Sequence, residues 1–174
     1  NRFPGQDILL SPEMKSTGEV MGLDADLGTA YAKSQMASGG SLPLEGRVFI
    51  SVSDAHKAEV TDLAKRFVEL GFKLISTTGT AAVLTEAGLE VESVPKLAEG
   101  RPNTLDLLKN NEIQLVINTP SGQAPRADEI KIRTTAIYTN TPIMTTIGSA
   151  KAAAEGIAAL KENGYGVKSL QEFL

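Results

Sequence analysis

Cysteine is absent from this sequence, and histidine occurs only once, as His56. The lack of cysteine excludes disulfide bonds, cysteine-ligated zinc and thiol catalysis, and it is typical of proteins of a reducing cytoplasm. A single histidine excludes a metal site built from several histidines. Tryptophan is also absent and aromatic residues make up only 5% of the chain, so we expect no platform for stacking nucleic-acid bases.

The charge balance and the short apolar runs exclude two further classes of partner. The net charge of −4 gives no reason to expect nucleic acid. No apolar run approaches the roughly 18–20 residues of a membrane helix, and residues 1–5 do not open a signal peptide. With 174 residues, 41% of them hydrophobic, we expect about one packed cytoplasmic domain with a short appendage. Because the chain begins with Asn1 rather than Met, we expect it to be part of a longer protein.

The sequence divides into two unequal parts. Residues 1–37 hold an irregular opening and a predicted helix from about 24 to 36, which is too little to bury a core of its own. Residues 38–45 are rich in Gly and Ser and are typical of a flexible linker. From residue 46 to 174 strands and helices alternate. This alternation predicts an α/β domain with a mainly parallel sheet and helices on both faces.

Within residues 46–174, apolar runs predict the strands and apolar spacing predicts the helices. The strands are expected at 47–52, 72–76, 89–94, 114–117 and 142–145. The helices are expected at 60–68 with a stop at Gly71, from 77–80 to Gly88, and at 103–109, 128–138 and 149–160. Residues 128–138 also alternate like a strand, but a helix preserves the order of elements. Residues 165–174 are expected to form a strand or short helix packed on the sheet edge.

Polar residues follow each of the first four predicted strands. They are Ser51 and Lys57 after the first, Thr77 and Thr80 after the second, Lys96 after the third, and Asn118 and Thr119 after the fourth. Ligands of parallel sheets bind at the carboxyl ends of the strands, so these side chains should share one site. A helix start, hydroxyls and two lysines suit a phosphate, and Asn118 could hydrogen-bond a base or sugar.

These residues also have purely structural interpretations. Residues 77–80 are typical of a helix cap, and most surface lysines are solvated. Asp54 and His56 could form an acid–base pair, but Asp54 is equally placed as a helix N-cap and the two would not face each other. Pro102 suits the first turn of a helix that Asn103 caps. Serine-hydrolase, P-loop and zinc-peptidase motifs are absent, so the sequence predicts binding rather than catalysis.

Two stretches resemble the large subunit of carbamoyl-phosphate synthetase. Residues 3–5 and 11–22 resemble the close of its second ATP-grasp unit, which would make residues 1–37 the tail of that domain. Residues 46–174 resemble its C-terminal allosteric domain, with matching landmarks at 77–80, 99–102 and 117–119. The resemblance implies a Rossmann-like three-layer fold of the methylglyoxal-synthase type, with a five-stranded parallel sheet flanked by helices.

The resemblance also implies a regulatory role. Such domains bind nucleotides, typically UMP as inhibitor and IMP as activator, and so control carbamoyl phosphate synthesis for pyrimidines and arginine. It implies that Lys57, Thr77, Thr80 and Lys96 contact the phosphate, with the other three polar residues nearby. The implied partners are the rest of the large subunit, the glutaminase small subunit through it, and optionally further copies of this chain. The parent would use ATP with Mg or Mn, whereas no cofactor is expected in this part.

Three positions depart from the family pattern. Pro120 stands where some bacterial members have a Thr, so one nucleotide contact is expected to be lost. Ile143 stands where ornithine-binding members have a Tyr, although Thr145 is retained, so activation by ornithine is not expected. Residues 100–102 lack the essential Asp of methylglyoxal synthases. Two alternatives stay open: a lyase of the methylglyoxal-synthase type, and an association module without a small ligand.

Overall fold

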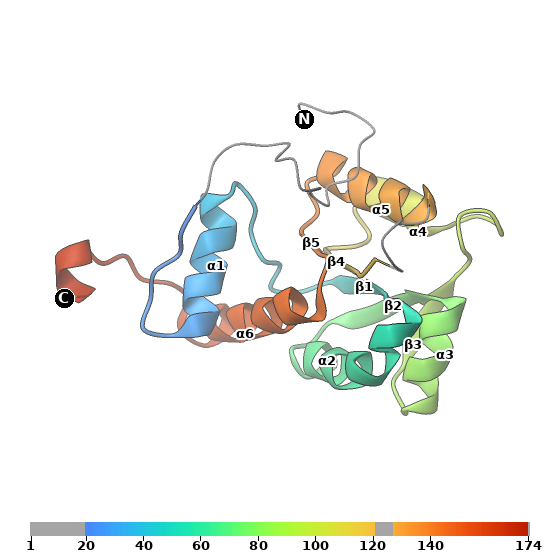
Figure 1. The fold of residues 1–174 in the computed structure, drawn as a ribbon, viewed down its shortest axis with the longest axis horizontal. Coiled ribbons are helices and arrows are strands. Elements are labelled where there is room, and N and C mark those ends of the chain that lie inside the picture. The colour runs from blue at the N-terminus through green and yellow to red at the C-terminus, as the bar shows by residue number, and fades with distance from the viewer. Residues whose placement is uncertain (1–19, 121–126, 174) are drawn as a thin grey trace.

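A computed structural model describes residues 20–120 and 127–173, and its centre is one parallel sheet (Figure 1). The five strands stand in the order β3-β2-β1-β4-β5. They are β1 Arg47–Ser51, β2 Lys73–Thr77, β3 Val91–Val94, β4 Leu115–Asn118 and β5 Ile143–Met144. Every pair of neighbours is parallel, which confirms the predicted five-stranded parallel sheet.

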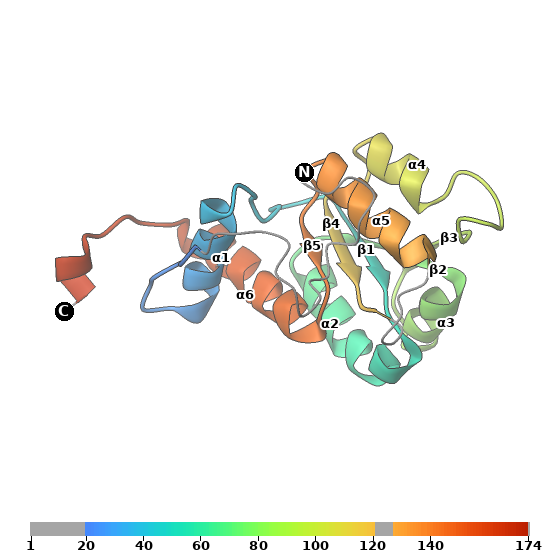
Figure 2. The same cartoon turned by 45° about the horizontal axis from the view of Figure 1, so that its top comes forward.

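Helices lie on both sides of this sheet (Figure 2). They are α1 Leu27–Ala37, α2 Lys57–Glu69, α3 Thr78–Glu86, α4 Thr104–Lys109, α5 Ala127–Tyr138 and α6 Ile147–Asn163, with short 3-10 helices η1 Asp54–His56 and η2 Leu170–Phe173. The segment 128–138, predicted as a helix although its residues also alternate like a strand, is helical, which confirms the prediction. Among the described residues, no helix is both long and apolar enough to cross a membrane.

Two apolar clusters, one on each face of the sheet, hold the layers together. Successive side chains of a strand point to opposite faces. Val48 and Ile50 of β1 therefore join the cluster beneath α2, α3 and α6, whereas Phe49 joins the cluster beneath α4 and α5. All three side chains are fully buried. The arrangement is the three-layer α/β fold that the sequence predicts.

A glycine sets the end of α2 and the entry into β2. Gly71 has φ +87°, in the left-handed region that favours glycine. The next residue, Phe72, donates its backbone N–H to the carbonyl of Phe67 at 3.0 Å, which closes the last turn. The predicted stop at Gly71 is confirmed, and the chain turns there directly into the sheet.

Three local predictions from the sequence are wrong. Asp54 is not the N-cap of a helix: Ser53 has that place, and Asp54 is the first residue of η1. Val68, expected on the buried face of α2, is 42% exposed because it lies at the margin of the apolar stripe. Pro102 is not in the first turn of α4, since Asn103 is the N-cap and Pro102 precedes it.

Helix α1 packs against α6 through positions without a side chain. A Cβ built on Gly28 would lie 2.7 Å from the carbonyl oxygen of Glu155, and one on Gly156 would lie 2.9 Å from Leu42 Cδ1. The two helices therefore approach backbone to backbone, with Leu42 buried against them. Residues 27–42 thus rest on the core of the second part. The division into tail, linker and domain stays a prediction.

The C-terminal segment does not pack on the sheet edge, contrary to expectation. After α6, Gly164 has φ +66° and redirects the chain. Tyr165, Val167 and Leu170 that follow are 58%, 90% and 63% exposed. Figure 1 shows η2 standing apart from the sheet. The segment therefore contributes little to the packed core.

Candidate functional site

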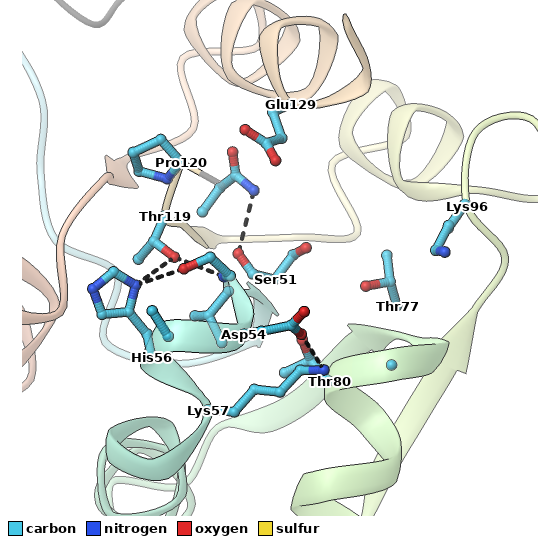
Figure 3. A pocket seen from close by; sticks show the side chains of 15 residues that line it. Ser51, Asp54, His56, Lys57, Thr77, Thr80, Lys96, Thr119, Pro120 and Glu129 are labelled. Carbon is cyan, nitrogen blue, oxygen red and sulfur yellow. Dashed lines mark hydrogen bonds and ion pairs between the residues drawn. The ribbon is translucent and has the colours of Figure 1, made fainter. Parts of the chain in front are cut away.

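A polar pocket of about 470 Å³ lies at the carboxyl ends of the strands (Figure 3). Strands β2 and β3 lie on one side of β1, and β4 and β5 lie on the other. This change of direction is where open α/β sheets bind ligands. All seven polar residues that the sequence singled out line the pocket: Ser51, Lys57, Thr77, Thr80, Lys96, Asn118 and Thr119.

The register of the strands brings these residues together. Ser51 at the end of β1 pairs with Asn118 at the end of β4. Thr77 at the end of β2 pairs with Val94 of β3, and Lys96 follows two residues later. Because each strand ends at the same level, their polar side chains reach one space.

The N-terminus of α3 opens on this pocket. Thr77 is its N-cap, yet the Thr77 side chain makes no capping hydrogen bond, whereas the N-caps of α1, α4 and α6 do. Thr80, in the first turn, is buried and lines the pocket. A Cβ built on Gly79 would lie 4.0 Å from Lys57 Nζ, so this ammonium group sits beside the first turn of α3. Such an arrangement attracts anions.

Lys57 and Lys96 each form an ion pair with a carboxylate, and exposure to solvent weakens both pairs. Lys57 Nζ lies 2.6 Å from Asp54 Oδ1, on a side chain that is 92% exposed (Figure 3). Lys96 Nζ lies 3.8 Å from Glu99 Oε1, and both side chains are more than half exposed. Exposed ion pairs contribute only about 0–1 kcal/mol. A bound phosphate could therefore replace either carboxylate at little cost.

Thr119 and His56, together with Ser53, form a hydrogen-bonded cluster in another part of the pocket wall. Thr119 Oγ1 accepts the backbone N–H of Ser53 at 3.0 Å. His56 Nδ1 lies 2.9 Å from Ser53 Oγ and 3.2 Å from Thr119 Oγ1. Asp54 forms an ion pair with Lys57, whereas His56 Nδ1 lies against the hydroxyls of Ser53 and Thr119.

A buried arginine on α5, which was not predicted from the sequence, forms a hydrogen bond with Asn118. Arg133 on α5 is completely buried, and its Nη1 donates to Asn118 Oδ1 at 2.9 Å. Asn118 Nδ2 in turn donates to the carbonyl of Ser51 at 3.3 Å. Glu129, one turn before Arg133, lies 3.7 Å from Arg133 Nη1 and also lines the pocket. Asn118 thus links β1, β4 and α5 through both ends of its amide.

A smaller recess of about 100 Å³ opens beside the pocket. Leu97, Thr104, Asp128 and Ile132 line it, together with five residues of the main pocket. No motif or strand-end position in the sequence indicates Leu97 or Thr104 as site residues. The Glu129–Arg133 spacing of four residues on a helix was a usable signal for the buried pair.

The chemistry of these side chains suits binding an anion. In the described ranges, no group of three or more His, Asp or Glu side chains could hold a metal ion. The acidic groups at the pocket, Asp54 and Glu129, each lie beside a cation. Hydroxyls, an open helix N-terminus and two lysines make up most of the other polar groups on the wall.

Comparisons with known proteins agree on one family. The family model described as "MGS-like domain" matches residues 59–145. The carbamoyl phosphate synthase large chain of Nostoc sp. is 49% identical over 173 residues, which is 99% of this chain but 16% of that protein. The "C-terminal section" of that large chain in Methanopyrus kandleri is 48% identical over 172 residues, 98% of this chain and 32% of that protein.

The chain therefore spans about a sixth of the length of full large chains and a third of the separate section. A methylglyoxal synthase from Elizabethkingia anophelis has the same fold, with a TM-score of 0.53 and 18% identity. That match covers 65% of this chain and 79% of the synthase. Its identity is low enough that it speaks to the fold alone.

Proposed function

Because the chain belongs to the MGS-like domain family and is about half identical to carbamoyl phosphate synthase large chains, we propose that it is a nucleotide-binding regulatory domain of such an enzyme. The observation that supports this proposal best is a convergence. Seven polar residues, which lie at or shortly after the carboxyl ends of four strands, line one pocket at the switch point of the sheet.

The phosphate of a nucleoside monophosphate would dock at the N-terminus of α3. Thr77 and Thr80 would donate hydrogen bonds there, and Lys57 lies beside the same turn. Lys96 would contact the phosphate from the β3 side and would give up its exposed ion pair with Glu99. Two full positive charges and a helix N-terminus match a dianion.

Binding there would act on catalysis through the packing of this domain on the rest of the large chain. Effector coupling of this kind typically amounts to about 1–3 kcal/mol, which adjusts affinity for a substrate such as ATP rather than switching it off. We propose UMP as inhibitor and IMP as activator of carbamoyl phosphate synthesis. The glutaminase subunit would respond indirectly.

The test is calorimetric titration of this chain with UMP and with IMP at moderate salt, using Lys96→Ala and Lys73→Ala as a matched pair. Lys73 is an exposed lysine at the opposite edge of the same sheet. Losing a charge-assisted hydrogen bond should weaken the nucleotide about ten- to hundredfold in Lys96→Ala. Lys73→Ala should bind as the unchanged chain does.

Other outcomes would point to the alternatives. If neither nucleotide binds, the function moves toward association with neighbouring domains without a small ligand, or toward a different effector. If the chain converts dihydroxyacetone phosphate, it is a lyase, although residues 100–102 supply no carboxylate at the place where methylglyoxal synthases have theirs. Equal affinity in Lys96→Ala and the unchanged chain would refute the phosphate assignment.

A further inference from the structure

The recess beside the pocket is continuous with it. Five residues line both spaces: Ser51, Thr77, Lys96, Asn118 and Glu129. A ligand whose phosphate lies at α3 can therefore extend into the recess without leaving the protein surface. The recess, at about 100 Å³, has room for a flat ring that enters from its open side.

The walls of the recess differ from those of the pocket. Leu97 and Ile132 give it apolar surface, and Ile132 is almost fully buried in the cluster beneath α5. Asp128 and Glu129, in the first turn of α5, add acidic groups to its rim. Apolar walls favour a planar ring, while carboxylates repel a phosphate. The phosphate should lie toward the lysines and the ring toward the recess.

The side chain of Thr104, which lines this recess, carries a buried polar atom that has no partner among the described residues. Thr104 is 1% exposed, and its Oγ1 makes no hydrogen bond with any described residue. Buried polar side-chain atoms are nearly always hydrogen-bonded in folded proteins. The cap of α4 does not use this hydroxyl either, because Asn103 accepts from Leu105 N–H and Asp106 accepts from Asn103 N–H.

We infer that Thr104 is a specificity-determining residue whose hydroxyl hydrogen-bonds a polar atom on the base of the bound nucleotide. The capping box of Asn103 and Asp106 holds the first turn of α4, and so keeps this hydroxyl in place before the ligand arrives. A hydroxyl both donates and accepts, so it suits a carbonyl or an N–H on the ring edge. This inference rests on the proposed nucleotide binding and names how the base is recognised.

The experiment compares Thr104→Val with Thr141→Val in this chain. Valine keeps the shape of threonine and removes the hydroxyl. Thr141 is also buried, but its Oγ1 lies 2.9 Å from Thr139 Oγ1 and it lines neither space. Calorimetry would measure the binding of UMP, IMP and ribose 5-phosphate, which has the phosphate but no base. Thermal unfolding without ligand would be measured in parallel.

We expect Thr104→Val to weaken the nucleotide about three- to tenfold and to leave ribose 5-phosphate unchanged. Its unfolding temperature should stay the same or rise, because an unpartnered hydroxyl is removed. Thr141→Val should bind normally and unfold earlier. Unchanged nucleotide affinity in Thr104→Val, or an equal loss for ribose 5-phosphate, would overturn the inference. If the unchanged chain binds none of the three ligands, the proposed function itself fails.

Discussion

The two edges of the sheet have hollows of similar size but opposite character. The hollow at the carboxyl edge measures about 470 Å³ and the one at the amino edge about 420 Å³. At the amino edge Arg47 forms ion pairs with Glu92 and with Glu112, and Gln114 Oε1 accepts the Arg47 backbone N–H at 2.8 Å. The polar groups there satisfy one another.

At the carboxyl edge several polar groups have weaker or missing partners. The Lys57 and Lys96 ion pairs lie in solvent, the Thr77 side chain leaves the start of α3 uncapped, and the Thr104 hydroxyl has no described partner. Volume alone does not separate a binding site from a structural hollow. The two hollows differ instead in the state of their polar groups, and a ligand gains most from groups that are not already satisfied.

The largest effect should come from the buried arginine that supports the carboxyl edge. Replacing Arg133 by Met leaves Asn118 Oδ1 without its donor and Glu129 without a 3.7 Å cation. Breaking a buried charged network of this kind costs about 3–5 kcal/mol. The free energy of unfolding, measured in urea, should fall by about that amount.

The control for this variant is Lys131→Met on the same helix, at an exposed position. It should change the free energy of unfolding by less than about 0.5 kcal/mol. A similar loss in both variants would mean that α5 tolerates no change at all, and that Arg133 has no special part in the site.

A smaller effect on stability is expected at the amino edge. Arg47→Met removes two ion pairs of a partly exposed network, so the free energy of unfolding should fall by about 1 kcal/mol. Lys73→Met, at the register partner of Arg47, is the matched control and should be nearly neutral. Nucleotide affinity should be unchanged in both. Weaker binding in Arg47→Met would show that the two edges are coupled and that the amino edge is not purely structural.

The smallest effect concerns the exposed carboxylate beside Lys57. In Asp54→Asn the lysine loses its 2.6 Å partner, and a phosphate no longer has to displace or approach a negative charge. Affinity for the nucleotide should rise about two- to fivefold at low salt, and the gain should shrink as salt is added. Asp62→Asn is the control, because Asp62 is also an exposed carboxylate paired with a lysine, Lys65, and lies outside the pocket. Weaker binding in Asp54→Asn would mean that Asp54 assists the ligand.

Much of this fold was predictable because its signals are local or periodic. The apolar strand at residues 47–51, the stripe of Val60, Leu63, Ala64 and Phe67, and the glycine at 71 each act within a few residues. The site followed from one rule about parallel sheets, which placed Lys57, Thr77, Lys96 and Thr119 at one edge.

What the sequence did not reveal depends on packing between distant residues. In the sequence Arg133 looks like any arginine of an exposed helix. It is buried only because α5 packs onto β4. Thr104 becomes notable only because its neighbours leave its hydroxyl without a partner. A short helix does form at Leu170–Phe173, but the prediction that this segment packs on the sheet edge was wrong for the same reason, since a run of mixed polarity gives no indication that Gly164 turns the chain away from the sheet.

The central place of β1 also has a consequence for folding. The bond from Ser53 N–H to Thr119 Oγ1 joins residues 66 positions apart, and Arg47 and Gln114 are 67 apart. Contacts of such sequence separation form late, because chain entropy must be lost before they contribute. The pocket is therefore complete only once β4 has docked beside β1. A ligand that needs Thr77 and Thr119 together can stabilise only the finished domain, so it should slow global unfolding without speeding the early steps of folding.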